Sequence, residues 1–428
     1  MLFSSIIGSD MQTNNESIKK NIFFLLFVQG TNYLFPLLTF PYISHIIGPD
    51  GFGKIAFAQA IITYLMFVVD FGFNLTVTKA ISICHKNNNV EGIRELFNST
   101  IFAKIIIFII IIIITTPIVF YFKSLYDIRY LIIVGYLSLI GAVFFPVWYF
   151  QGIQQMKGIA IASTIAKVIC ILFVFVLVKN KDDLIEVMFI YSLNFLSAAA
   201  VSFFYLRKNS EIYYKKPVFK EIKNLFIDSF PIFISYLGSS IYTTVNILFL
   251  GFFLPSNLVG LYSSADKIRA VAQNILSPIS QAVFPNLSSH VGDRAVFNSK
   301  LNKFSFFFLS ISFLISLSLF ILSKEIVTLL LDPRFYEAYK ILMVLSLLPF
   351  IISIAIIYGQ WGLVNIGKQG VLSKIYMSSG LFHLTHIFIT IHFFGGVGAA
   401  FSVLLTESLV SILILICFIK YREENQHA

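Results

Sequence analysis

Charged residues are scarce in this sequence. Only 12% of its 428 residues are Asp, Glu, Lys or Arg, whereas a soluble domain carries about a quarter. Cysteine is scarce as well: Cys84, Cys170 and Cys417 lie far apart, without the spacing of a disulfide framework or a zinc site, and we expect them to be packing residues. The composition therefore argues against an ordinary soluble enzyme and against a disulfide-stabilised secreted domain.

Apolar residues dominate instead. They make up 57% of the chain, the mean hydropathy is +0.86, and runs such as 105–122 and 171–178 are apolar on every side. A bilayer core about 30 Å thick needs roughly 20 such residues to be crossed as a helix. Alternation of apolar and polar residues, the pattern of a membrane β-barrel, is absent. The sequence therefore predicts an all-α polytopic membrane protein.

Polar segments divide the apolar runs into about twelve predicted transmembrane helices. The connections are short, and the longest is the basic stretch 207–224. An enzyme acting on extracellular sugar or lipid would carry its acids and bases in a large outer loop, and no predicted outer loop exceeds about a dozen residues. The predicted spans lie near 22–45, 54–78, 99–122, 130–150, 158–178, 184–206, 225–252, 258–284, 304–323, 338–360, 371–393 and 397–419.

The two halves of the chain resemble each other at a spacing of about 208 residues. Because each half has an even number of spans, the repeats are expected to run parallel, as in transporters whose substrate site lies between the halves. Matching residues include Gly53, Ala58 and Ile61 with Gly260, Ala265 and Ile268. We therefore expect two six-helix lobes around a central cavity, divided into a cytoplasmic tail at 1–20, an N-terminal lobe at 21–206, a cytoplasmic linker at 207–224, a C-terminal lobe at 225–419 and a cytoplasmic tail at 420–428.

Basic residues predict the orientation of these helices. With the N-terminus inside, most lysines and arginines fall in cytoplasmic segments, so both termini are expected to face the cytoplasm. The net charge of +10 reflects this bias and an affinity for anionic lipid headgroups, and no nucleic acid partner needs to be invoked. Residues 1–20 are too polar for a signal peptide, and we expect the first apolar run to remain as the first helix, with Met1 or Met11 as the start.

The stretch 261–278 places charges inside a predicted span. At about 100° per residue, Asp266, Arg269 and Gln273 share one narrow helical face, together with Tyr262, Ser277 and Ser280. Arg269 lies about ten residues, or roughly 15 Å, from the outer end and so near the middle of the bilayer. A charge there costs about 2.5–3.5 kcal/mol, so it is expected to face protein or water. Arg269 is therefore a candidate anion site in a hydrated cavity.

A structural role for the same residues remains open. Asp266 and Arg269 are three residues apart and could neutralise each other, so that the pair only holds the helix in place. Lys267 points about 100° away from Arg269 and suits either role. Two further lysines are candidate basic groups at other depths: Lys167 near the middle of the fifth span, and Lys374 near the cytoplasmic end of the eleventh, where reaching out to the interface is the alternative.

Other spans carry polar faces that we expect to converge on the same lumen. Hydrogen bonding between packed helices is the alternative for each of these Ser, Thr and Asn side chains. Proton or cation coupling is one candidate use of the acidic residues, and Glu407 could equally be a buried, protonated acid bonded to a neighbour. The lumen candidates are Gln29 and Asn32 in the first span, Gln59, Thr63 and Asn74 in the second, Asn246 in the seventh and Gln273 in the eighth, and the coupling candidates are Asp70, Asp266 and Glu407.

Sequence patterns that would indicate a metal, a nucleotide or catalysis are weak. His383 and His386 lie one turn apart, but no carboxylate or cysteine stands at ligand spacing, so packed or interfacial histidines are expected and no metal. The run GLVNIGK at 362–368 fits the start of a P-loop, but Gln369 replaces the required Ser or Thr, and we interpret the run as a helix-ending turn. No catalytic constellation can be placed, so we expect neither an enzyme nor a bound cofactor.

The stretch at 35–82 carries a family resemblance. Its pieces LTFPYISHIIGPDGFG, AFAQAI and DFGFNLTVT resemble the N-terminal signature of the O-antigen (Wzx-type) flippases of the multidrug/oligosaccharidyl-lipid/polysaccharide (MOP) superfamily. FPVWYFQGIQ at 145–154 and GGVGAAFSVLLTE at 395–407 also fit this family. The resemblance covers nearly the whole chain in the number and order of spans, and only the first stretch is strongly specific.

This resemblance implies a MATE-like fold of two six-helix lobes, alternating access, and movement of an undecaprenyl-diphosphate-linked oligosaccharide from the cytoplasmic to the periplasmic leaflet of the bacterial inner membrane. In similar flippases, basic residues of the cavity are thought to receive the diphosphate, and Arg269, Lys267 and Lys374 are the candidates here by position. Expected partners are the lipid-linked glycan, membrane lipids, and polymerase and chain-length proteins of the same pathway.

Other classes of function stay open at this point. A small-molecule or drug antiporter shares the fold but would favour an acidic cavity, whereas basic candidates outnumber acidic ones here. A polysaccharide polymerase or ligase would need the large outer loop that the sequence lacks. A scaffold for glycan-assembly enzymes leaves the polar faces unexplained. Proton or cation antiport, the membrane potential, or consumption of the product outside could each supply the energy.

Overall fold

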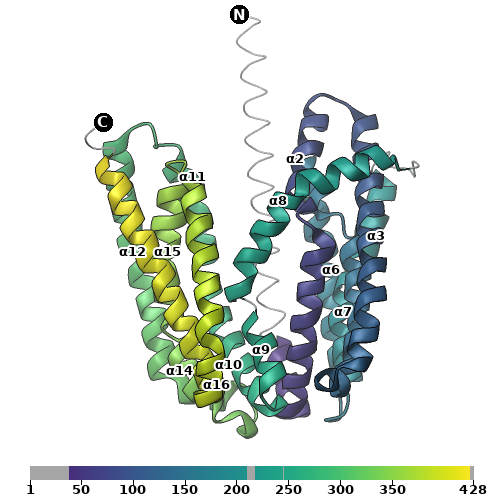
Figure 1. The fold of residues 1–428 in the computed structure, drawn as a ribbon, viewed down its shortest axis with the longest axis vertical. Helices are drawn as coiled ribbons and strands as arrows, with labels where there is room; N and C mark the ends of the chain where they lie inside the picture. The colour runs from purple at the N-terminus through teal and green to yellow at the C-terminus, as the bar shows by residue number, and fades with distance from the viewer. Residues whose placement is uncertain (1–37, 210–216, 244, 425–428) are drawn as a thin grey trace, which may run out of the picture. The chain divides into compact units, whose positions relative to one another are not determined.

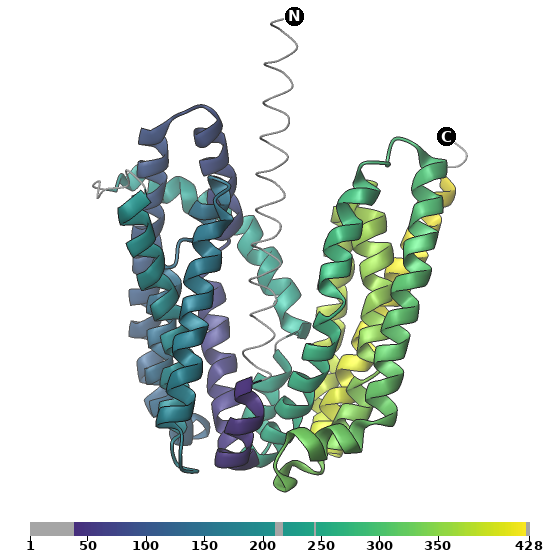
Figure 2. The ribbon, with the colours of Figure 1, turned by 180° about the vertical axis from the view of Figure 1, so that it is seen from behind.

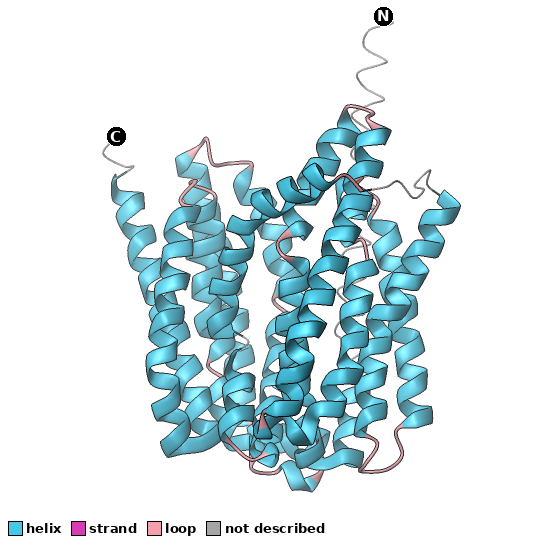
Figure 3. Cartoon of the chain, turned by 45° about the vertical axis from the view of Figure 1, so that its right-hand side comes forward, coloured by secondary structure: helices cyan, strands magenta, loops and turns pink. Residues whose placement is uncertain are grey.

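The structure is a computed structural model that describes residues 38–209, 217–243 and 245–424. Within these ranges it consists of helices and short connections, with no β-strand (Figure 3). Eight of the described helices are long and apolar enough to cross a membrane. The predicted class, an all-α polytopic membrane protein, is therefore confirmed. Those eight are Leu38–Lys86, Val90–Tyr121, Lys123–Gly152, Met156–Leu177, Leu184–Arg207, Arg294–Ile321, Ala338–Val364 and Gln369–Arg422.

Two of these eight helices change direction at a glycine with positive φ. Gly48 has φ of 69° and lies between the predicted spans 22–45 and 54–78, and Gly395 has φ of 56° and lies between the predicted spans 371–393 and 397–419. Glycine adopts this left-handed conformation without the steric cost that a Cβ imposes, and Pro49 directly after Gly48 cannot continue the preceding helix. The breaks between these predicted spans are confirmed, while the total of about twelve spans stays a prediction.

The chain forms two compact units, and their boundaries differ from the ends of the predicted lobes. Residues 41–60 belong to the second unit together with 235–428, whereas 61–234 belong to the first. In the first unit the helices are α2 (Phe73–Lys86), α3 (Val90–Tyr121), η1 (Lys123–Ile128), α4 (Arg129–Phe144), α5 (Val147–Gly152), α6 (Met156–Leu177), α7 (Leu184–Asn209) and the first part of α8 (Phe219–Thr243).

Small and polar side chains hold the first unit together. α7 packs against both α4 and α6, and Figure 1 shows α6 and α7 side by side. A Cβ on Gly141 of α4 would overlap the backbone of Phe195 on α7, so these two helices approach as closely as glycine allows. Beside this contact, Ser138 Oγ donates to Ser192 Oγ at 2.9 Å. Close packing and hydrogen bonds between helices replace the hydrophobic effect, which lipid does not supply.

The second unit continues with the end of α8 and a series of shorter helices. These are α9 (Val245–Phe253), α10 (Ser256–Asn274), α11 (Ser277–Ser288), α12 (Arg294–Ile321), α13 (Ser323–Leu330), η2 (Pro333–Phe335), α14 (Ala338–Leu345), α15 (Leu348–Ala355), the π-helical η3 (Ile356–Val364) and α16 (Gln369–Glu424). α15 packs against α12 and α16 (Figure 2). Trp361 lies in its core, 4.8 Å from the Phe308 ring, and its Nε1 donates to Ser280 Oγ at 3.0 Å.

Repeat-related glycines meet inside this unit. A Cβ on Gly53 would overlap the carbonyl oxygen of Ser256, and a Cβ on Gly260 would overlap the carbonyl oxygen of Pro49. Pro49 and Ser256 have the same sequence separation as the two glycines, so the contact is reciprocal: each repeat presents equivalent positions to the other. Reciprocal contacts of this kind form at a two-fold axis. The matching of Gly53 with Gly260, inferred from the sequence, is therefore visible as a physical contact.

An arginine from the connection before α14 caps the helix that ends at Gly48. Arg334 Nη2 donates to the carbonyl oxygen of His45 at 2.8 Å, and its Nε donates to Asp332 Oδ1 at 2.7 Å. A cation at a helix C-terminus binds carbonyl groups that have no partner within the helix. The hydrogen bond from Arg334 also holds the pKa of Asp332 below its usual range. This cap fixes the turn that leads into the Gly53 contact.

Two sequence interpretations can be compared directly with the helices. The predicted span 258–284 is interrupted, because α10 ends at Asn274 and α11 begins at Ser277, with Pro278 in its first turn, where the missing N–H is tolerated. Ile275 and Leu276, between the two helices, keep right-handed helical dihedral angles, so the predicted face through Gln273 and Ser277 stays a prediction. The reading of 362–368 as a helix-ending turn is confirmed, because η3 ends at Val364 and Gly367 has φ of 77°.

Candidate functional site

Arg269 lies on α10 between two polar residues of the same helical face. Its Nε donates to Asp266 Oδ1 at 3.0 Å, its Nη2 forms an ion pair with the same oxygen, and its Nη1 donates to Gln273 Oε1. These partners stand three and four residues away, the spacings at which side chains on a helix meet. The predicted grouping of Asp266, Arg269 and Gln273 is therefore present. It includes the neutralising pair that the structural alternative describes.

Arg269 and Gln273 also line a cavity within the second unit. The cavity has a volume of about 490 Å³, and polar groups from other helices reach it: Gln360 of η3, and Tyr376 and Glu407 of α16. Its remaining walls are apolar, formed by Leu348, Ile352, Ala355, Ile356, Val364, Leu372 and Val403. A few polar groups in a largely apolar pocket are typical of a binding site, where they fix the orientation of a ligand.

The cavity contains one cation and one carboxylate among its described lining residues. A guanidinium group has five N–H groups. Asp266 and Gln273 accept hydrogen bonds from three of those of Arg269, so two remain for a ligand oxygen. Glu407 is 8% exposed and makes no hydrogen bond or ion pair to a described residue. The arrangement can therefore bind an anion at Arg269, and it can bind or release a proton or cation at Glu407.

The two lysines predicted near Arg269 lie elsewhere. Lys267 Nζ lies 4.6 Å from the centroid of the Phe52 ring, where the cation contacts the negative face of the aromatic system. Phe52 itself packs edge-on against Phe335 at 6.0 Å. Lys374 is an exposed residue of α16. Neither lysine is among the residues that line the cavity, because Lys267 points to another side of α10 and Lys374 to another side of α16.

The first unit holds a buried ion pair of which sequence reasoning found only one partner. Lys104 of α3 is 1% exposed, and its Nζ lies 2.6 Å from Asp70 Oδ1 and donates to the carbonyl oxygen of Ala142 at 3.3 Å. Asn74 Nδ2 donates to the other oxygen of Asp70 at 3.1 Å. Lys104 is the sole charged residue of the predicted span 99–122. The rule that applied to Arg269, that charge inside a span marks function, also applied to Lys104.

The remaining candidates are spread over both units. Lys167 lies buried on α6 in the first unit, which also contains Thr63 and Asn74, whereas Gln59 belongs to the second unit. Gln59 and Thr63 are both half-buried. Gln29 and Asn32 lie outside the described residues. A common lumen for these residues and Arg269 stays a prediction.

Asn246 is part of a buried hydrogen-bond network with a histidine. Its Oδ1 lies 2.9 Å from His383 Nε2, and His383 Nδ1 lies 2.7 Å from Thr406 Oγ1. Asn246 is 3% exposed and His383 is fully buried. The prediction of a packed histidine is confirmed for His383, and Asn246 bonds between helices, as its alternative reading proposed. Among the described residues, no group of three His, Cys, Asp or Glu could hold a metal ion.

Replacing His383 by leucine is expected to destabilise the second unit. Leucine fills a similar volume but leaves Asn246 without this partner in an apolar interior, which costs about 1–3 kcal/mol. The melting temperature of the purified protein in detergent measures the effect. His392→Leu is the matched control, because His392 is exposed and a change there should leave the melting temperature nearly unaltered. Chelator should also leave it unaltered, and a fall with chelator as large as that of His383→Leu would contradict the packing role.

Solved structures of membrane transporters share the fold of this chain. An inward-facing multidrug resistance MATE family transporter of the MOP superfamily superposes with a TM-score of 0.76 over 92% of this chain and 95% of that chain, at 14% identity. The lipid II flippase MurJ superposes with a TM-score of 0.73 over 92% of this chain and 86% of that chain, at 15% identity. The chain therefore has the fold of these two transporters.

Sequence comparison places the chain more closely. It belongs to the polysaccharide biosynthesis protein family, whose model matches residues 18–291. It is 32% identical to a Shigella dysenteriae protein described as an O-antigen transporter, over 93% of this chain and 99% of that protein. It is 33% identical to an Escherichia coli K12 protein of the same description, over 95% of this chain and 97% of that protein. The family resemblance seen in the sequence is confirmed.

Proposed function

We propose that the protein is a flippase that moves lipid-linked oligosaccharide repeat units of a surface polysaccharide, such as O-antigen, across the membrane by alternating access. The observation that carries this proposal is the similarity to O-antigen transporters along nearly the whole length of both chains. The fold shared with a lipid II flippase agrees with it. The chain has no proposed catalytic role.

Chemistry of the cavity supports the same substrate class. A diphosphate needs a donor whose charge persists in a low-dielectric site, and a guanidinium offers parallel N–H groups to phosphate oxygens. Arg269 supplies this group, while Gln273, Gln360 and the Tyr376 hydroxyl suit sugar hydroxyls. The carrier is proposed to be undecaprenyl diphosphate. Lys267, Lys374 and Lys167 are proposed as further basic contacts in other conformations of the transport cycle.

Orientation and energy coupling complete the proposal. We propose that both termini lie in the cytoplasm, as the distribution of basic residues favours, and that the protein lies in the bacterial inner membrane and hands its substrate to the polymerase and chain-length proteins of the pathway. Glu407, which shares the cavity with Arg269, is the proposed proton or cation site. Asp266 and Asp70 are proposed as charge partners that release Arg269 and Lys104 when they are protonated.

Glu407 also favours a second candidate, a cation-coupled antiporter of small molecules. A buried carboxylate in a largely apolar cavity suits a cationic ligand. The fold permits this function, since multidrug transporters share it. The paired guanidinium in the same cavity argues against it, because a cation would be repelled by Arg269.

Deletion of the gene in its host tests the main proposal. We expect the deletion to leave lipid-linked repeat units in the cytoplasmic leaflet and to remove surface polysaccharide, and the wild-type gene to restore both. The leaflet is determined by labelling of the glycan in intact and in permeabilised spheroplasts. Repeat units that reach the periplasm but stay unpolymerised would contradict a flippase. Loss of drug resistance with normal polysaccharide would support the antiporter instead.

A further inference from the structure

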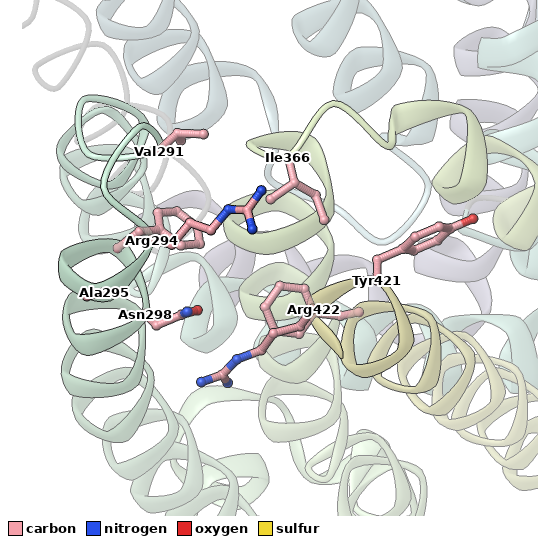
Figure 4. Close-up of a pocket in the computed structure, with 9 residues that line it drawn as sticks. Val291, Arg294, Ala295, Asn298, Ile366, Tyr421 and Arg422 are labelled. Atoms are coloured by element: carbon pink, nitrogen blue, oxygen red, sulfur yellow. The ribbon is translucent and has the colours of Figure 1, made fainter. Parts of the chain in front are cut away.

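A second cavity of the second unit lies at the C-terminal end of α16. It has a volume of about 500 Å³ and is bordered by the first turn of α12, the connection after η3, and the last turns of α16. Figure 4 shows the side chains of Arg294 and Arg422 extending from α12 and α16 toward the space between these helices. The lining residues are Val291, Arg294, Ala295, Phe297, Asn298, Ile366, Phe418, Tyr421 and Arg422.

The charged side chains that line this cavity are arginines. Among the described lining residues none is acidic, and the two charged ones, Arg294 and Arg422, come from separate elements. Lys368 adds a third cation next to them, with its Nζ 4.6 Å from the centroid of the Tyr421 ring. A guanidinium group presents parallel N–H groups that match the oxygens of a phosphate, and its positive charge strengthens those hydrogen bonds. The cavity is therefore suited to a phosphate group.

Its floor is apolar and firmly packed. Phe297 and Phe418 are buried members of the same core cluster as Trp361, and Ile366 packs against that cluster. Asn298, one turn after Arg294, adds an amide at the edge. An apolar floor beneath a cationic rim fits an amphipathic ligand, whose phosphate contacts the arginines while its hydrocarbon covers the phenylalanines. A soluble phosphate would use the rim and leave the floor empty.

Position along the chain points to the same class of ligand. The connections 289–293 and 365–368 and the end of α16 fall in segments that the distribution of basic residues assigns to the cytoplasmic face. Anionic lipids are concentrated in that leaflet, and basic pockets between helices bind their headgroups. We propose that the cavity between Arg294 and Arg422 binds the phosphate group of an anionic membrane lipid. This site is separate from the Arg269 cavity and does not depend on the proposed transport function.

Native mass spectrometry of the purified full-length protein tests the proposal. With phosphatidylglycerol, the wild type is expected to retain bound lipid, and with phosphatidylcholine it is expected to retain far less. The double variant Arg294→Gln/Arg422→Gln should bind phosphatidylglycerol at least about tenfold more weakly, because two charge-assisted contacts are lost. Arg294→Lys/Arg422→Lys keeps the charge and should bind at an intermediate level.

A charge-matched control distinguishes a specific lipid site from general electrostatic attraction between anionic lipid and the basic protein. Arg207→Gln/Lys220→Gln removes the same charge from exposed positions of the first unit and should bind like the wild type. Equal weakening in both double variants would overturn the site, as would equal binding in all variants. Equal melting temperatures verify that the variants are folded. Inorganic pyrophosphate tests the soluble source: if it binds through Arg294 and Arg422 and phosphatidylglycerol does not compete, the lipid assignment is wrong.

Discussion

Gly260→Ala is expected to leave little correctly folded protein in the membrane, and Gly53→Ala is expected to do the same. The added Cβ would overlap the carbonyl oxygen of Pro49 in the first case and that of Ser256 in the second. Overpacking usually costs about 1–3 kcal/mol, when side chains can move aside. Here the obstacle is backbone on both sides, so the helices must separate and the cost should reach or exceed that range. Yield of monodisperse protein and its melting temperature after detergent extraction measure the effect.

Two other glycines provide the matched controls. Gly292 and Gly370 have no atom within 4 Å of an added Cβ, so alanine at either position adds the same methyl group in open space. Gly370→Ala lies in the first turn of α16 and should leave stability unchanged or slightly raised, because alanine loses less backbone entropy on folding. Wild-type yield and melting temperature for Gly260→Ala would contradict the assignment of this contact as a fixed crossing point of the two repeats.

The crossing point illustrates how far the sequence predicts the fold. Spacing pairs Gly53 with Gly260, and hydropathy locates the apolar helices, because both features are local or periodic. Spacing cannot show that the two glycines touch, since related residues meet only where they lie on the symmetry axis. It also does not assign residues 41–60 to the second unit, because that assignment depends on contacts with α10 and with Arg334.

The candidate site shows a similar limit. Helical periodicity predicts the group of Asp266, Arg269 and Gln273, because all three belong to one helix. It cannot bring Gln360, Tyr376 and Glu407 to them, because these residues come from other helices whose rotation is set by packing. For the same reason it does not place Lys267 over Phe52. Lys104 could have been identified from the sequence, because it is a lone charge in an apolar span.

Loss of the guanidinium at position 269 is expected to abolish most of the translocation. Arg269→Ala removes a charge-assisted contact worth about 1.5–3 kcal/mol, which corresponds to a decrease of about ten- to 150-fold in substrate affinity. Arg269→Lys should retain part of the activity, because an ammonium group keeps the charge but cannot present parallel N–H groups. Appearance of lipid-linked repeat units in the periplasmic leaflet of the complemented deletion strain measures both variants.

Arg269→Ala by itself does not separate substrate binding from helix packing, because it also leaves Asp266 without its ion-pair partner in a partly buried position, which destabilises the fold. The double variant Asp266→Asn/Arg269→Gln removes both charges while polar side chains of similar size remain at both positions. If Arg269 binds the diphosphate, the double variant should accumulate and melt like the wild type and still leave repeat units in the cytoplasmic leaflet. If the double variant translocates at the wild-type rate, the pair only holds α10 in place.

Asp266→Asn alone provides the complementary test. This variant keeps the guanidinium of Arg269 and frees it from its carboxylate partner, so translocation should persist wherever the variant is folded.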